Sequence, residues 1–272
     1  MNTEAANPLE GTDPIAMLNY LVPELQESFN SAFVIDFGNG FGITQYILYA
    51  ILVFILTLVI VLTVGRRLTL VPNSKFVNMV EYGYQMVRNN IGENTIGHGY
   101  KKHVPLLATI FFFILISNFI GLIPGAKAAT GSIQITWALS IVAFVYFNYW
   151  GVKAHGGWGY IKSIAPSGLP APMVPVIWVF EFVSLVIRVL TLAVRLYGNM
   201  FAGHMALGVF ALFATTFVTA MINGAGAIGG VSVLWLAFEV FMYALETLVA
   251  FLQAYVFTIL TAVYINLATS SH

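Results

Sequence analysis

The sequence contains no cysteine, no proline beyond Pro175, and few charged residues. The absence of cysteine excludes disulfide bonds, thiolate metal sites and cysteine nucleophiles, and it leaves the redox compartment open. Only 11 basic and 11 acidic residues occur among the 272, about a third of the ~25% charged residues usual in soluble domains. This scarcity excludes a soluble enzyme domain, a disordered chain and a nucleic-acid-binding protein.

Hydrophobic residues make up 59% of the chain, with 22 Phe, 13 Tyr and 5 Trp, and the mean hydropathy is +0.87. This composition predicts an all-α membrane protein that crosses the bilayer several times. We expect five transmembrane helices, one interfacial amphipathic helix, and a final pair of helices that forms a long, strongly tilted hairpin. The predicted segments are an acidic outer tail (1–40), the first transmembrane helix (41–65), the interfacial helix (75–94), a transmembrane hairpin (104–150), an irregular loop (151–175) and the proline-free hairpin (176–268).

The proline-free hairpin holds two apolar stretches, 176–221 and 231–268, on either side of a glycine-rich turn at 223–230. As continuous helices they would be roughly 69 Å and 57 Å long, whereas the hydrocarbon layer is only ~30 Å thick. Neither stretch contains a proline or a polar cluster that would break it. We therefore predict two unbroken, steeply inclined helices.

The basic residues predict the orientation. They lie between the first and second spans and after the third, which places these loops in the cytoplasm by the positive-inside rule. The acidic tail and Lys127 are then outside, and five crossings return His272 to the cytoplasm. The residues that set this orientation are Arg66, Arg67, Lys75, Arg88, Lys101, Lys102, Lys153 and Lys162.

Five charged residues lie within the proline-free hairpin, where each would cost between ~2.5 and ~10 kcal/mol at mid-membrane. They are Glu181, Arg188, Arg195, Glu239 and Glu246. A spacing of seven relates the first three residues, and it also relates Glu239, Glu246 and Gln253. Seven residues are close to two helical turns, so each helix carries one polar stripe.

An antiparallel hairpin places residues equidistant from its turn at the same depth. His204 and Glu246 are equidistant from residue 225, and Arg195 and Gln253 from residue 224, and both centres lie in the glycine-rich turn. Nine residues separate His204 from Arg195, so we expect them on opposite faces of their helix. Structural ion pairs remain an alternative for these charges.

Three segments resemble subunit a of the membrane sector of F-type ATP synthases. LTLAVRLYGNMFAGHMALG (190–208) carries the family's Arg, Gly-Asn-Met and second Gly at Arg195, Gly198, Asn199, Met200 and Gly203. LETLVAFLQAYVFTILTAVYINLA (245–268) is similar to the last helix, including its Gln at Gln253, and LLATIFFFILISNFIGLIPG (106–125) to the second crossing. His204 and Glu246 exchange the imidazole and the carboxylate relative to some bacterial members.

The resemblance implies an ion-conducting stator with two offset proton half-channels beside a ring of c subunits. Arg195 would bar a direct proton path and attract the ring carboxylates, and Asn199 and Gln253 would support it. His204, Glu246 and Glu239 would line the outer half-channel, and Glu181 the inner one. The resemblance implies no catalytic site, cofactor, metal or nucleic acid.

The partners so implied are the c ring, the peripheral-stalk b subunits, the rest of the synthase, membrane lipid and protons. The implied location is the bacterial inner membrane, with the mitochondrial inner membrane as an alternative. His204 favours H⁺ over Na⁺. A secondary transporter is the rival interpretation, but no internal repeat is found. A structural scaffold would leave the charged stripes unexplained.

The predicted orientation is tested by impermeant labelling of single cysteines in intact cells. Thr12→Cys should be labelled and Ser163→Cys should not, because the first lies in the outer tail and the second in a cytoplasmic loop. Labelling of Ser163→Cys alone would contradict the assignment.

Overall fold

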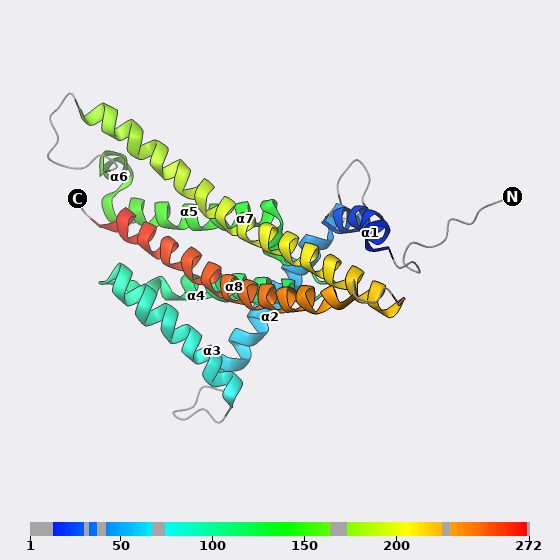
Figure 1. The fold of residues 1–272 in the computed structure, drawn as a ribbon. Helices are drawn as coiled ribbons and strands as arrows, with labels where there is room; N and C mark the ends of the chain where they lie inside the picture. The colour runs from blue at the N-terminus through cyan, green and yellow to red at the C-terminus, as the bar shows by residue number, and fades with distance from the viewer. Residues whose placement is uncertain are drawn as a thin grey trace.

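The computed structural model describes residues 13–29, 33–36, 42–66, 74–163, 173–224 and 229–270. Within them, five helices are long and apolar enough to cross a membrane, which confirms the predicted fold class (Figure 1). They are α2 (Gln45–Arg66), α4 (Val104–Gly121), α5 (Ile133–His155), α7 (Val174–Ile222) and α8 (Ser232–Thr269).

Sequence patterning missed several short elements. Helix α1 (Pro14–Phe29) packs against α7, and strands β1 (Phe33–Asp36) and β2 (Gly42–Thr44) pair antiparallel before α2 begins. The expectation of an irregular loop over 151–175 is wrong for most of its described residues. Helix α5 continues to His155, Gly156 turns the chain with a φ of 74°, and α6 (Gly157–Ser163) follows. The first twelve residues, residues 164–172 and His272 lie outside the described residues.

The amphipathic segment is helical throughout. Helix α3 (Lys75–Gln85) continues directly into η2 (Met86–Ile96), whose turns are of the wider π type. Its apolar positions Val77, Val80, Val87 and Ile91 recur at helical spacing and are all buried. Through this buried face η2 packs against the membrane-spanning helices α4 and α8.

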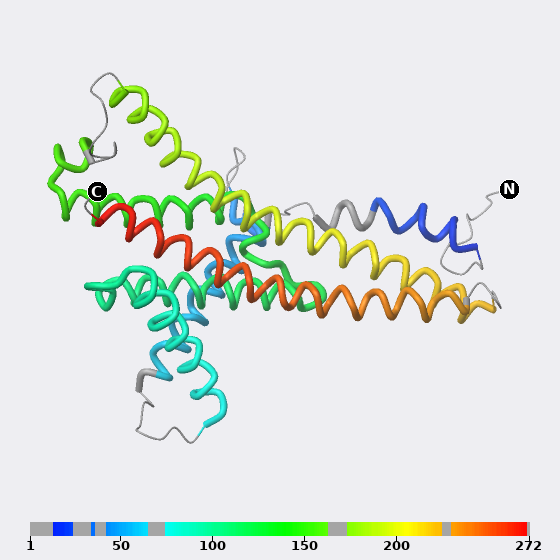
Figure 2. The backbone as a smooth tube through the Cα atoms, turned by 60° about the vertical axis from the view of Figure 1, so that its left-hand side comes forward, coloured from blue at the N-terminus to red at the C-terminus, as the bar shows by residue number. Residues whose placement is uncertain are grey.

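Helices α7 and α8 contain 49 and 38 residues without interruption, as the absence of proline predicted. They run antiparallel, close together near their connection and further apart toward Val174 and Thr269 (Figures 1 and 2). Helix α5 contacts both of them. At 1.5 Å per residue they are roughly 74 Å and 57 Å long, so they fit a bilayer only if steeply inclined.

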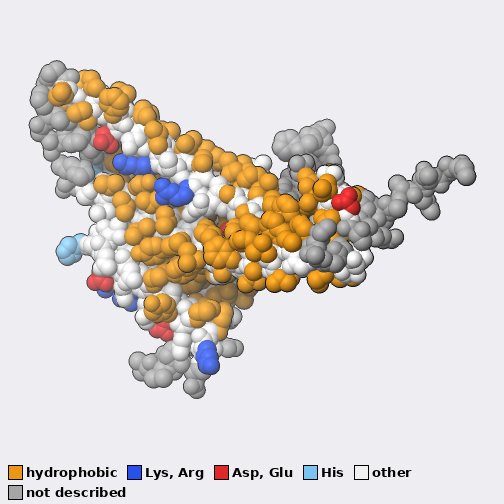
Figure 3. Space-filling model, in the orientation of Figure 1, with side chains coloured by type: hydrophobic (Ala, Val, Ile, Leu, Met, Phe, Trp, Pro, Cys, Tyr) orange, Lys and Arg blue, Asp and Glu red, His pale blue; other side chains and the backbone are white. Residues whose placement is uncertain are grey.

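The core lies between α4, α5, α7 and α8. It is filled by large apolar side chains that are less than about a tenth exposed, including Leu107, Phe111, Ile114, Phe147, Leu192, Leu196, Phe257 and Ile265. Asn118 of α4 donates from Nδ2 to the Ala250 carbonyl oxygen of α8 at 3.1 Å, the interhelical bond expected of an amide in a span. Hydrophobic side chains also cover most of the outer face of α7 and α8 (Figure 3).

A buried histidine lies at the start of α4. His103 is 1% exposed, its Nδ1 is 3.1 Å from the Tyr146 hydroxyl, and its ring contacts Trp150 edge-on. Burial, together with the nearby charge of Lys102, lowers the pKa of His103 from 6.5 to about 4. The neutral imidazole is therefore the folded form at neutral pH.

This histidine predicts a loss of stability in mild acid. Between pH 6.5 and pH 4 the unfolded chain binds a proton at His103 that the folded chain does not, so the free energy of unfolding falls as the pH is lowered. His103→Gln should flatten this slope in thermal unfolding of the purified protein. His98→Gln, at an exposed histidine, should leave the slope as in the wild type. Equal slopes for all three proteins would contradict the assignment.

Candidate functional site

Polar side chains of α7 and α8 meet between the two helices. Asn199 donates from Nδ2 to Gln253 Oε1 at 2.7 Å, and the Glu246 carboxylate lies directly against Gly203. In each pair, the two residues lie at equal distances along the sequence from a position close to residue 225. The observed register thus lies within about two residues of the register that His204, Glu246, Arg195 and Gln253 predicted. We call Asn199, His204, Glu246 and Gln253 the polar seam.

The polar seam contains buried groups without partners. Glu246 and Gln253 are 2% and 3% exposed. Glu246 Oε1, Gln253 Nε2 and His204 Nε2 have no hydrogen-bond partner within the described part of the chain. An unpaired buried polar atom costs about 1–3 kcal/mol, and water or an exchanging proton would remove that cost. The seam therefore combines one bond that joins α7 to α8, between Asn199 and Gln253, with buried polar atoms that are left without a partner among the described residues.

His204 opens into a cavity of about 340 Å³, which we call the His204 cavity. Tyr46 of α2, Lys127 and Tyr243 of α8 also line it. The imidazole reaches this space beside Gly121 at the end of α4, where an added Cβ would come within 2.8 Å of His204 Nε2. A volume of this size holds several water molecules.

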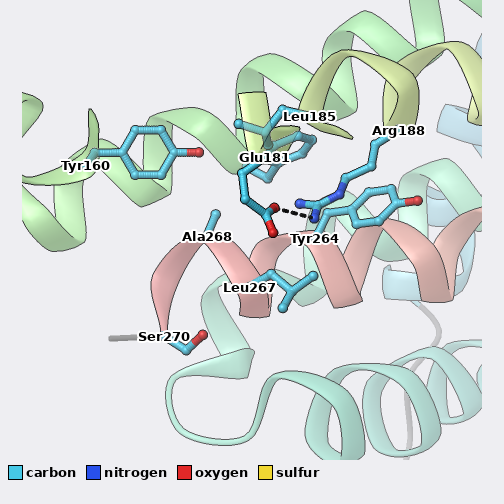
Figure 4. Close-up of a pocket in the computed structure, with 9 residues that line it drawn as sticks. Tyr160, Glu181, Leu185, Arg188, Tyr264, Leu267, Ala268 and Ser270 are labelled. Carbon is cyan, nitrogen blue, oxygen red and sulfur yellow. Dashed lines mark ion pairs between the residues drawn. The ribbon is translucent and has the colours of Figure 1, made fainter. Parts of the chain in front are cut away.

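A second, smaller cavity lies toward the other end of α7. We call it the Glu181 cavity; it has a volume of about 50 Å³, and Tyr160, Glu181, Arg188 and Tyr264 line it from three helices (Figure 4). Arg188 Nη2 is 3.9 Å from Glu181 Oε2, and the guanidinium lies 5.5 Å from the centre of the Tyr264 ring. Both side chains are partly exposed, at 24% and 41%, so the ion pair stabilises the fold little.

Arg195 lies on α7 between the two cavities. At 1.5 Å per residue it is roughly 14 Å along the axis from His204 and roughly 10 Å from Arg188. Its side chain is exposed, and it forms no hydrogen bond or ion pair with any described residue. Exposed residues on the same part of α7 include the apolar Leu190, Val194 and Phe201 and the polar Asn199, which lies one turn after Arg195. His204 points to another side of the helix, into its cavity.

Other predicted site residues are placed differently. Asn199 and Gln253 bond to each other rather than to Arg195. Glu239 lies two turns before Glu246, is half-buried and does not line the His204 cavity. Sequence reasoning missed Tyr46 and Tyr243, because no spacing rule links α2 to α8. Lys127 was recognisable only as the lone charge of a hairpin turn.

The chain is similar to known proteins of one family. Residues 47–266 match the family model described as ATP synthase A chain. The chain is 38% identical over 236 residues to the ATP synthase subunit a of Nocardioides sp., covering 85% of this chain and 84% of that one. It is 39% identical over 198 residues to the ATP synthase subunit a of Brucella ovis, covering 72% and 76%. The corresponding protein of Brucella suis gives the same values.

The contact between Gly203 and Glu246 predicts a steric effect that a second substitution relieves. Gly203→Ala should lower the free energy of unfolding by about 1–3 kcal/mol, because its Cβ overlaps the carboxylate. Adding Glu246→Ala should recover much of this loss. Gly198→Ala is the matched control, since nothing lies within 4 Å of a Cβ there. The measurement is denaturation of the purified protein in detergent, and equal losses for both alanine variants would contradict the packing.

Proposed function

Since the chain belongs to the ATP synthase subunit a family, we propose that it is the ion-conducting stator subunit of a rotary ATP synthase. In this proposal it has no catalytic site and requires no cofactor. It provides two offset half-channels that deliver protons to, and collect them from, the carboxylates of a c-subunit ring. The observation that carries the proposal is the position of Arg195 between two separate cavities on one helix.

Arg195 is the barrier between the half-channels. A guanidinium keeps its proton at any physiological pH, so it cannot relay a proton from one cavity to the other. Its permanent charge favours the ionised form of each ring carboxylate that faces it, which releases the proton toward the exit side. The exposed apolar side chains around it supply the surface along which the ring slides.

The His204 cavity is the outer half-channel. Its volume admits water, and the unpaired Nε2 of His204 supports a role in proton transfer. The buried Glu246 carboxyl of α8 lies against Gly203, the residue before His204 on α7, and in this proposal it receives the proton next. Glu239 lies outside this cavity, so its part in the outer half-channel rests on the family resemblance alone. The bond between Asn199 and Gln253 joins α7 to α8 one turn from Arg195.

The Glu181 cavity is the inner half-channel. Glu181 is the acidic group of this cavity, and its partial exposure lets it exchange protons with water. Arg188, whose guanidinium lies over the ring of Tyr264, pairs with the carboxylate without sealing it from water, because the ion pair is long and partly exposed. Tyr160 closes one side of the space (Figure 4).

We assign the remaining partners from the same role. The c ring covers Arg195, peripheral-stalk b subunits bind elsewhere on the helices, and membrane lipid covers the rest. The location is a bacterial inner membrane, with the N-terminus outside and the C-terminus in the cytoplasm. The basic loops before α4 and after α5 support this orientation.

Removing the charge of Arg195 tests the proposal most directly. Arg195→Ala should abolish proton-driven ATP synthesis in inverted vesicles without preventing assembly, and should raise passive proton conductance once the catalytic head is stripped. Arg195→Lys should also fail, because an ammonium can lose its proton when desolvated and lacks the planar fork. Arg88→Ala, at an exposed arginine of η2, is the control. Substantial synthesis by Arg195→Ala would exclude the mechanism.

Exchanging the two titratable groups of the outer half-channel tests whether they act together. His204→Glu combined with Glu246→His should support more ATP synthesis than either single change, because one imidazole and one carboxyl remain at the same depth. Purely additive losses across the four proteins would show that the two side chains act independently.

A further inference from the structure

Two lysines from different segments converge on one tryptophan at the end of the α4–α5 hairpin. Lys102 Nζ, just before α4, lies 4.2 Å from the centre of the Trp150 ring, and Lys153 Nζ, near the end of α5, lies 4.7 Å from it. Lys153 is also 6.0 Å from the ring of Tyr149. We call Lys102, Trp150 and Lys153 the lysine–tryptophan cluster. It lies outside both cavities of the proposed proton pathway.

Two like charges beside one ring repel each other. Each ammonium gains from the negative face of the indole, but their shared position brings both charges to within about 9 Å of each other. No carboxylate among the described residues pairs with either lysine. An anion between the two ammonium groups would turn this repulsion into attraction.

The ring of Trp150 also packs against a buried side chain. His103 contacts it edge-on with 4.9 Å between ring centres, and the buried His103 is itself bonded to the hydroxyl of Tyr146. Trp150 is therefore fixed by packing rather than free to follow the lysines. The two ammonium groups approach a prepared surface, which is what a binding site requires.

The position of the cluster identifies the anion. Helix α4 begins at Val104 and α5 ends at His155, so Lys102 and Lys153 lie at the ends of two helices that are long and apolar enough to cross a membrane. Such ends are expected at the membrane–water interface. Trp and Tyr side chains are typical of this depth, and the anions abundant there are lipid phosphates. Tyr149 is 58% exposed beside the cluster and offers a ring to the glycerol region of a lipid.

We propose that Lys102, Trp150 and Lys153 bind the phosphate group of an anionic membrane lipid. The two ammonium groups hold the phosphate oxygens, and the indole supports the lipid backbone below them. This site does not depend on the proposed proton pathway, because none of its residues lines either cavity. Anionic lipid at this position would fix the ends of α4 and α5 relative to the bilayer.

The test measures lipid retained by the intact, delipidated complex in native mass spectrometry. Dioleoyl phosphatidylglycerol and dioleoyl phosphatidylcholine are titrated separately into wild-type complex and into the double variant Lys102→Gln with Lys153→Gln. We expect one phosphatidylglycerol molecule per complex to bind roughly tenfold more weakly in the double variant, since each lysine near a phosphate contributes a few-fold. Phosphatidylcholine binding should be the same in both.

A matched control removes the same charge elsewhere. Lys101→Gln with Lys162→Gln changes two exposed lysines that do not contact Trp150, and it should bind phosphatidylglycerol as the wild type does. Trp150→Leu keeps both charges and should weaken binding by removing the surface. Equal phosphatidylglycerol binding by all variants would overturn the proposal. So would displacement of the lipid by millimolar inorganic phosphate, which would indicate a free-anion site, or cross-links from these lysines to another subunit.

Discussion

The close approach of α7 and α8 at Gly203 is the contact on which the candidate site depends. With only a hydrogen at this position, the Glu246 carboxyl fits between the two helices, and one turn away Asn199 bonds Gln253 at 2.7 Å. Together they fix both the separation and the register of the pair. Because His204 follows Gly203, the same contact turns the imidazole toward Gly121 and the cavity. Gly203 thus leaves room for the Glu246 carboxyl, and Gly121 leaves room for the His204 imidazole.

The seam differs in kind from the other polar network of the core. Thr130 donates from Oγ1 to Asn118 Oδ1 at 2.7 Å, and Asn118 donates to the Ala250 carbonyl, so each group has a partner. Such bonds hold α4 to α8. In the seam, Glu246 and His204 retain unpaired buried atoms at a cost in stability. The unpaired atoms of His204 and Glu246 are the ones that the proposed proton transfer would use.

Hydropathy and residue spacing predicted the pairing of α7 with α8, and the reason is physical. Two unbroken antiparallel helices have one free parameter in their register, the centre of the turn. Two polar pairs, His204 with Glu246 and Arg195 with Gln253, were enough to locate it. The β1–β2 pair and α6 were missed because they are too short for periodicity to detect. Helix α1 was missed although it has 16 residues, because Pro23 lies inside it and a proline usually marks the end of a helix. The partner of Asn199 was missed because a shared helix face does not fix a rotamer. Lys127 and Tyr46 needed the tertiary structure to bring them to one cavity.

Arg195 presents a charge that the described chain leaves without a counterion. Exposed to lipid, a guanidinium at mid-membrane would cost between ~2.5 and ~10 kcal/mol or more. Glu181 is already paired with Arg188, and Glu246 is directed at Gly203, so neither carboxylate serves Arg195. In the proposed function, the counterion is a carboxylate of the c ring, which meets Arg195 beside the exposed side chains of Val194 and Phe201. Since the guanidinium never loses its charge, it would stabilise the ionised form of each carboxylate that faces it. In the proposed mechanism, each successive carboxylate would give up its proton before it meets Arg195 and take another after it.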